Sequence, residues 1–533
     1  KVMDATTTRR AKVSKELSSK LIYWEIKRQG KNEILKPQYA KKDLSTLIPK
    51  VMEDMGLTTK LRNSIYEIYH RTNGGIPSTK AAATSNKIAG GALGTGKRAD
   101  QESELDTIKE ARRQWEEGIC EELNALGLEQ HRPLARSRAN ITTQGEKIRS
   151  FVQGTDASVG ASTRRFLFDS EDLLEAIAAI DSPNHSSNVT RIQSWGMIRV
   201  LLKTPDITEL RSIFSELHPS MSQIGLDDAL EGNDKWFQDR CALGEKILSA
   251  GYIAVIRQYA KRGIPAGLRS KMWRKMLNLE LSQAERNYFD MLQSQVDEVD
   301  ILVDQLFHMD VEHAVDDDSY FPFEKELDDT VMAFSRDPWV LGNCANRVHP
   351  PLIGRTIDGH NVGIFPPGGV QPFRGLVSYA APLCFIYHEP AEIYYIFREM
   401  FSQLWCKLNS INSERSCIVM LSKLFEDLIQ RFEPELFRHL LDVGISPLAL
   451  SFSWIQLAFV GYLQTDQLLL LWDRVLAEGD RGLMLLPILA ASIFVYRSHA
   501  LMKARDVQEV KDILGDPSQL LVVPLLQHFL FFV

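Results

Sequence analysis

Long helical patterns fill the second half of this 533-residue chain, and they limit the folds that it can adopt. From about residue 252 to the end, segments rich in Leu, Phe, Tyr and Trp are joined by Gly and Pro turns, and the alternation typical of β-strands is scarce. Helices with wide apolar faces bury those faces against one another, so this half is expected to be an all-α domain. Because 44% of the residues are hydrophobic, the chain can bury a large core and form two or three domains.

The first half divides by composition into three parts. Residues 1–71 alternate apolar and charged positions at helical spacing, which predicts an N-terminal helical region. Residues 72–102 are rich in Gly, Ala, Ser and Thr and predict a flexible linker. Residues 103–250 begin with a charged helix and continue as a helical or mixed accessory region with polar stretches. The all-α domain and its C-terminal helices then occupy residues 251–533.

The predicted linker contains a partial match to a phosphate-binding loop. The stretch GALGTGKR, from Gly91 to Arg98, has the glycines and the lysine of a P-loop. A P-loop also needs Ser or Thr after the lysine to ligate magnesium, and a buried strand before the glycines. Arg98 occupies the first place and polar linker the second, so the pattern favours a linker.

The balance of charge and cysteine argues against several classes of protein. A formal net charge of -7 and a pI near 6.0 are not typical of a nucleic-acid binder. The six cysteines lie far apart without a CxxC pair, which indicates free thiols rather than a disulfide framework or a zinc site. No signal peptide is evident, and the apolar run from Leu483 to Tyr496 is too short to span a bilayer. We therefore expect a cytoplasmic protein.

One acidic segment with two histidines invites a metal interpretation. In HMDVEHAVDDD, from His308 to Asp318, no glutamate follows the first histidine and the second histidine comes five residues later, unlike a zincin helix. The last aspartates fit an acidic loop that caps a helix beginning near Pro322. No metal site is expected, and no nucleophile elbow or reactive cysteine stands out.

The most specific local pattern is RQYAKRGIPAGLRSKMWRKML, from Arg257 to Leu277. Gly263 and Pro265 mark a turn, and apolar residues then recur at intervals of four on a helix. On charge alone this basic segment is typical of a solvated helix face. Its cations are Arg257, Lys261, Arg262, Arg269, Lys271, Arg274 and Lys275.

The turn and helix of this segment resemble a known family. RGIPAGLRSKMW is similar to the opening motif of the TBC domain of Rab GTPase-activating proteins. RGLVSYAAPLCFIYHEPAEIYYIF resembles the central helices of that domain, and LFRHLLDVGISPLALSFSWIQLAFVGYLQTDQLLLLWDRVL resembles its final section. The resemblance covers about residues 255–500 with its motifs in order. It implies an all-α, multi-helix TBC domain, preceded by a mostly helical region with flexible linkers.

The resemblance also implies a reaction. A small GTPase hydrolyses GTP slowly, and an arginine inserted by a partner can supply ~10³–10⁵ in rate. TBC proteins add a glutamine that positions the attacking water. The two fingers belong to an IxxDxxR motif and a YxQ motif.

The arginine finger aligns with Arg336 in TVMAFSRDPW. Ala333 stands where the family has aspartate and Thr330 where it has isoleucine. Because an aspartate one turn earlier could orient the arginine, its loss leaves two alternatives. Either another carboxylate holds Arg336, with Asp337 and Asp329 as candidates, or it is an exposed arginine at a helix end.

The glutamine finger is replaced. The alignment puts Arg374 in its place and Pro372 in the place of the tyrosine, while Gln371 comes three residues too early. A guanidinium accepts no hydrogen bond from water, so it cannot do the work of the glutamine. Arg374 could instead contact a phosphate or an acidic switch surface.

The resemblance thus predicts an activator of a Rab-family GTPase in vesicle and membrane traffic, with Arg336 as catalytic finger. GTP and Mg²⁺ would arrive on the partner, so no cofactor of its own is expected, and the partner would recruit the protein to endomembranes. The first alternative is a TBC-fold effector or scaffold that binds a Rab without accelerating hydrolysis, because Arg374 replaces the glutamine. A second is a helical adaptor unrelated to GTPases. The residues expected to bind the partner are Arg374, Arg262, Arg269, Trp273 and Asp473.

Overall fold

The computed structural model separates into two units, Lys1–Ala92 and Leu93–Val533, and every described residue belongs to the second. The predicted helical region 1–71 and residues 72–95 of the predicted linker lie outside the described residues. The structure describes residues 96–129, 135–137, 167–180, 196–200, 202–229, 234–316, 320–344, 352–355, 361–517 and 519–532.

The regular elements in the described part of the chain are almost all helices, which confirms the all-α prediction. Two short antiparallel strand pairs accompany them: β1 (Ala135–Ser137) with β2 (Val299–Ile301), and β3 (Leu352–Arg355) with β4 (Asn361–Phe365). The α-helices are α4 (Gly96–Glu129), α6 (Ser170–Ala178), α8 (Ile207–Ile213), α9 (Asp234–Ala250), α10 (Ile253–Ala260), α11 (Ala266–Met276), α12 (Gln283–Glu298), α13 (Asp304–Val315), α14 (Glu324–Arg336), α15 (Pro338–Asn343), α16 (Pro390–Gln403), α17 (Ile418–Phe432), α18 (Pro434–Val443), α19 (Pro447–Gln456), α20 (Thr465–Glu478), α21 (Leu485–Leu501), α22 (Val507–Leu514) and α23 (Val522–Phe531).

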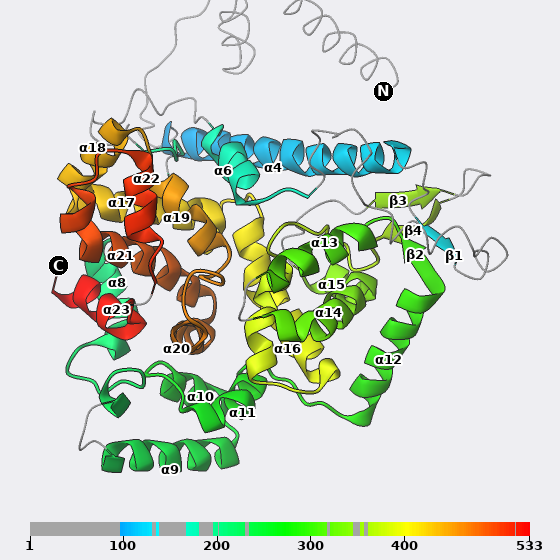
Figure 1. Cartoon of the computed structure of the whole chain (residues 1–533), viewed down its shortest axis with the longest axis horizontal. Coiled ribbons are helices and arrows are strands. Elements are labelled where there is room, and N and C mark those ends of the chain that lie inside the picture. Colours follow the sequence, from blue (N-terminus) through cyan, green and yellow to red (C-terminus); the bar gives the residue numbers. More distant parts are fainter. Residues whose placement is uncertain are drawn as a thin grey trace, which may run out of the picture. The chain divides into compact units, whose positions relative to one another are not determined.

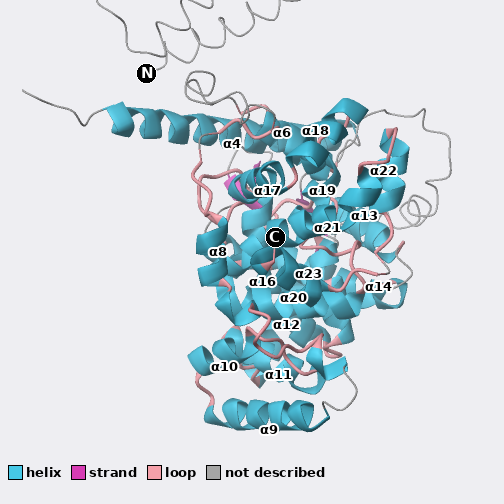
Figure 2. Cartoon of the chain, turned by 90° about the vertical axis from the view of Figure 1, so that its left-hand side faces the viewer, coloured by secondary structure: helices cyan, strands magenta, loops and turns pink. Residues whose placement is uncertain are grey.

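Most helices of the all-α half form two groups that meet at the core (Figure 1). Helices α12 to α16 lie on one side and α17 to α23 on the other, with α4 and α6 along one edge. Helices α9 to α11 lie at the opposite edge, and a view turned by 90° shows the same two edges (Figure 2). Where the groups meet, Trp472 packs between Trp405 and Trp273, with ring centroids 5.0 and 6.3 Å away. These three tryptophans are fully buried and anchor the core.

Helix α4 begins at Gly96, inside the stretch predicted as linker, and includes the predicted charged helix. Its exposed side carries ion pairs one turn apart, such as Arg113 with Glu110 and Glu117. Pairs at this spacing support a helix that has a narrow apolar face. Gly96 to Arg98, the end of the partial P-loop match, are therefore helical.

The stretch Thr465–Leu501 is apolar and helical enough to cross a membrane by length and composition. However, 67% of its apolar window is buried inside the protein, as in a core helix. It is also interrupted: α20 ends before Gly479, which has a positive φ of 62°, and a 3₁₀ turn leads into α21. We interpret it as two core helices.

The accessory region is joined to the all-α half by buried polar contacts. Glu426 of α17 is buried and accepts the backbone N–H groups of Met197 (2.7 Å) and Ile198 (3.1 Å). Arg474 of α20 is also buried, and it donates to the side chain of Gln223 and the carbonyl of Ile224. Buried polar groups need such partners, so the accessory region completes the core.

Candidate functional site

A buried carboxylate joins the two motifs with the strongest sequence signal. Asp473 of α20 accepts hydrogen bonds from Arg269 Nε and Nη2, both at 2.9 Å, and from Trp273 Nε1 at 2.8 Å. Ile264 adds its backbone N–H. Burial lowers the pKa of Arg269, but the Asp473 carboxylate more than offsets this and holds it above its ordinary value. Arg269, Trp273 and Asp473, expected to bind a partner, are buried and brace α11 against α20 instead.

Carboxylates outside the basic segment at 257–277 pair with most of its cations. Arg262, also expected to bind a partner, places Nε 2.6 Å from Glu216 Oε2 in the accessory region. Arg274 lies 3.0 Å from Glu392 in the first turn of α16. Partly exposed pairs of this kind contribute roughly 0–1 kcal/mol each. The pairs link the segment to neighbouring elements and neutralise most of its charge.

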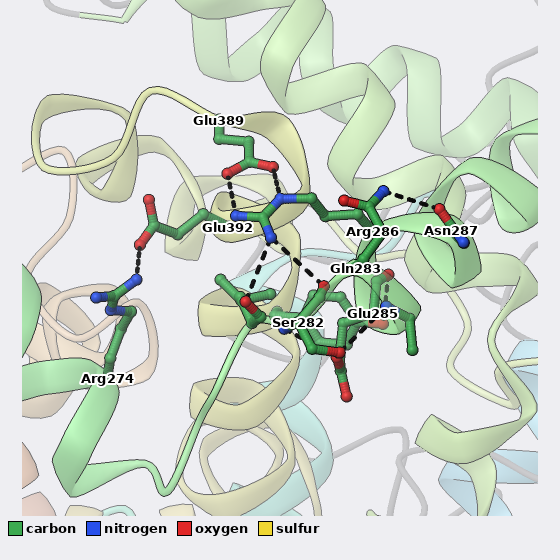
Figure 3. Close-up of polar contacts among 11 residues, drawn as sticks. Arg274, Ser282, Gln283, Glu285, Arg286, Asn287, Glu389 and Glu392 are labelled. Atoms are coloured by element: carbon green, nitrogen blue, oxygen red, sulfur yellow. Dashed lines mark hydrogen bonds and ion pairs between the residues drawn. The ribbon is translucent and has the colours of Figure 1, made fainter.

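Figure 3 shows a second pair beside the first. Arg286 of α12 donates hydrogen bonds to both carboxylate oxygens of Glu389, which immediately precedes α16. Glu389 thus lies in a turn between helices, and its pKa is lowered by the hydrogen bond from Arg286. Helices α11 and α12 are both tied to the start of α16.

Arg336, the predicted finger, is buried at the end of α14 with 2% of its surface exposed. Its Nη1 and Nη2 lie 2.7 Å from the two carboxylate oxygens of Asp304, at the start of α13. Nη1 also donates to Ser335 Oγ at 2.8 Å, and Nη2 to the carbonyl of Val299 at 2.9 Å. A bidentate pair of this geometry is both strong and specific. The carboxylate that holds Arg336 is Asp304, not the predicted Asp337 or Asp329.

Asp337 forms a second buried centre directly after Arg336. Its carboxylate accepts hydrogen bonds from the hydroxyls of Tyr288 and Tyr394 and forms an ion pair with Arg398. It also caps α15 by accepting the backbone N–H of Trp339. The peptide that joins Arg336 and Asp337 is therefore fixed from both sides.

Arg374 has the opposite environment. Its side chain is exposed, while its backbone N–H donates to the carbonyl of Phe168 at 2.9 Å. The next residue, Gly375, has a φ of 102°, and its N–H donates to Asp310 of α13. Val377 donates to the other oxygen of Asp310 at 2.8 Å. The turn is held at three backbone positions and presents one cation to solvent.

Comparisons with known proteins identify the family. A family model described as Rab-GTPase-TBC domain matches residues 371–502, a range that includes Arg374 and Asp473. TBC1 domain family member 19 of Homo sapiens is 35% identical to this chain over 530 residues, which span 98% of this chain and 97% of that protein. The chain belongs to the TBC domain family. The predicted resemblance is confirmed.

Two solved TBC structures are similar to part of the chain. The crystal structure of the Chlamydomonas flagellar RabGAP TBC domain has a TM-score of 0.38 and 12% identity, and the match covers 52% of this chain and 83% of that one. The crystal structure of the Ypt/Rab-GAP domain of Gyp1p has a TM-score of 0.37 and 14% identity, with 53% and 92% covered. The family assignment rests on the sequence matches.

Two aspartates on α13 are the site residues that the sequence did not reveal. Asp304 pairs with an arginine on the next helix, and Asp310 binds a turn more than sixty residues later in this TBC domain. No local spacing signals either contact. Asp310 also lies in the acidic segment with two histidines, where His308 pairs with Asp328 at 2.7 Å. Within the described residues, no group of three or more His, Cys, Asp or Glu side chains could hold a metal ion.

Proposed function

We propose that this protein binds a GTP-loaded Rab-family GTPase through its TBC domain, as an effector or scaffold in vesicle and membrane traffic. Membership of the Rab-GTPase-TBC family supports the partner class. One observation carries the choice of effector over activator: both terminal nitrogens of Arg336 are engaged by a buried carboxylate. GTP and Mg²⁺ come with the partner, which recruits this cytoplasmic protein to endomembranes.

The cost of releasing Arg336 explains this choice. A finger must leave its own domain to reach the nucleotide of the partner. Here that movement would strand Asp304, which is 4% exposed, without its cation. Breaking a buried pair by removing one partner costs about 3–5 kcal/mol. At that cost roughly one molecule in a hundred or fewer would present the finger unless Rab binding supplied the energy.

The family supports a second candidate, a Rab activator. In this case Rab binding opens the Asp304 pair and Arg336 enters the nucleotide site. The GTPase then uses its own glutamine to position water, since Arg374 cannot. An arginine finger alone is worth ~10³–10⁵ in rate, so the activity would be easy to detect.

Single-turnover GTP hydrolysis across a panel of GTP-loaded Rab proteins separates the two. Binding without acceleration supports the effector. Acceleration that Arg336→Ala abolishes, with binding retained, supports the activator. Because Arg336→Ala leaves a buried carboxylate unpaired, Asp304→Asn serves as a second variant that keeps the arginine and weakens its restraint. An activator limited by release of Arg336 should become faster with Asp304→Asn. If no GTP-loaded Rab binds, both candidates fail and the helical adaptor remains.

A further inference from the structure

The turn from Phe373 to Val377 presents one cation and buries its neighbours. Phe373, Gly375 and Val377 are buried, whereas Arg374 is exposed. Among the residues that the structure describes, none forms an ion pair or a hydrogen bond with the Arg374 guanidinium. The backbone that carries this arginine is held by hydrogen bonds from the N–H groups of Arg374, Gly375 and Val377.

Asp310 fixes the turn from the side of the core. It is 1% exposed and accepts the N–H groups of Gly375 at 2.6 Å and Val377 at 2.8 Å. Burial raises the pKa of Asp310 to about 7, although the N–H groups of Val377 and Gly375 and the charge of Arg374 oppose the increase. A Cβ on Gly375 would lie 2.6 Å from Leu457 Cδ2. The conformation of the turn therefore depends on this glycine and on this carboxylate.

The accessory region fixes the other side of the turn. The carbonyl of Phe168 accepts the Arg374 N–H, and the Phe168 ring packs on Phe373 with centroids 5.6 Å apart. Trp115 of α4 contacts the same ring edge-on at 5.1 Å. Residues from α4, the segment before α6 and α13 thus converge on a turn that exposes one arginine.

We propose that Arg374 is a specificity-determining contact to an oxyanion of the bound GTPase, and that Asp310 and Phe168 are positioning residues that hold it ready. This inference rests on the proposed binding of a Rab-type partner. It gives the site an attractive contact where the finger glutamine is missing.

The chemistry of the turn points to an oxyanion. A guanidinium offers a planar fork that matches carboxylate or phosphate oxygens bidentately. A preorganised backbone reduces the entropy lost when the contact forms, so a single residue can carry a large part of the affinity. The oxyanion can come from the nucleotide phosphates or from an acidic side chain of the GTPase.

The test measures the affinity of the full chain for one Rab that binds it, loaded either with a non-hydrolysable GTP analogue or with GDP. Arg374→Ala should weaken binding of the GTP form about tenfold or more. Arg374→Lys should recover only part of this, because it keeps the charge and loses the fork. Arg481→Ala, which removes an exposed arginine from another element, is the matched control and should change affinity less than about twofold.

The two nucleotide states narrow the source of the oxyanion. A loss confined to the GTP form places Arg374 at the terminal phosphate or at a switch segment that this phosphate orders. An equal loss in both forms places it at a carboxylate of the GTPase. A loss no larger than that of Arg481→Ala overturns the inference and leaves the proposed function standing. If the wild-type chain binds no Rab in either form, the proposed function fails and the contact fails with it.

The positioning residues are tested without relying on binding alone. Asp310→Asn and Phe168→Ala should speed amide hydrogen exchange at residues 374–377, which needs no partner. In a double-mutant cycle, Asp310→Asn should weaken Rab binding in the wild-type chain and have little further effect once Arg374 is alanine. If Asp310→Asn weakens binding equally in both backgrounds, its role is only structural and the positioning role is wrong.

Discussion

Arg336 and Arg374 carry the same chemical group in opposite environments: Arg336 is buried and Arg374 is exposed. The first lies in a bidentate pair inside the protein, and the second stands on a rigid turn without an ion pair among the described residues. Burying an arginine is tolerated only with a partner, which makes Arg336 and Asp304 one structural unit. The same argument removes Arg269 from the set of contact residues, because Asp473 holds it inside the core.

The Arg336–Asp304 pair gives the first prediction. Arg336→Met should lower the free energy of unfolding by about 3–5 kcal/mol, because it leaves Asp304 buried and unpaired. The double variant Arg336→Met with Asp304→Leu should recover most of that loss, since apolar groups can replace a buried pair. Urea denaturation measures both. A single variant as stable as the wild type would contradict this, because the Asp304 carboxylate would then not depend on Arg336.

Asp310 gives a prediction for pH. Its pKa is raised to about 7 in the folded protein from an ordinary value of 3.8, so the folded state holds its proton longer than the unfolded state. The stability that this group contributes is complete below the unfolded value and is lost as pH rises through about 7. Relative to Asp310→Asn, the wild type should lose on the order of 3 kcal/mol between about pH 5 and about pH 8. Urea denaturation of both proteins at each pH measures this, and a pH-independent difference would contradict it.

Helix α13 organises both arginines. Asp304 at its start holds Arg336 inside, and Asp310 further along holds the turn that carries Arg374 outside. The sequence predicted the helical class of this region and placed both arginines by alignment. It could not predict their environments, because each depends on a carboxylate brought close only by the packing of α13. The histidines that drew attention to this segment are not the residues that position the site.

The Gly375 turn allows a prediction at the level of the element. Gly375→Ala combines a positive φ with a contact of 2.6 Å, and it should destabilise the protein by about 1–3 kcal/mol. The control is Gly267→Ala in helix α11, where nothing lies within 4 Å of an added Cβ. That change should be neutral or stabilise by up to about 1 kcal/mol. Equal effects in thermal melts would mean that the turn adapts.

On the scale of the whole molecule, the accessory region and the all-α domain share one core. Glu426, Arg474 and Phe373 of the all-α domain each contact residues of the accessory region. The sequence predicted a domain boundary near residue 251 because long helical patterns begin there. Contacts between distant segments leave no pattern in the sequence. The sequence therefore could not predict how many buried contacts connect the accessory region to the all-α domain.

A truncation tests whether the all-α domain needs the accessory region to complete its core. A chain that begins at residue 251 should melt about 10 °C or more below one that begins at Leu93, because buried polar groups lose their partners and each costs about 1–3 kcal/mol. Glu426→Gln in the longer chain should show part of the same loss. Equal melting temperatures for the two chains would mean that the all-α domain completes its core without the accessory region.

The fluorescence of Trp339 can report a movement of the neighbouring residues Arg336 and Asp337. The guanidinium of Arg398 lies 3.9 Å from the centre of the indole ring, and the same arginine pairs with Asp337. A rearrangement that frees Arg336 would also disturb Asp337 and uncover this ring. Comparison of the wild type with Trp339→Phe isolates the intrinsic fluorescence of Trp339. This fluorescence should change when a bound GTPase releases Arg336 from Asp304, and it should stay constant when the GTPase binds without releasing it.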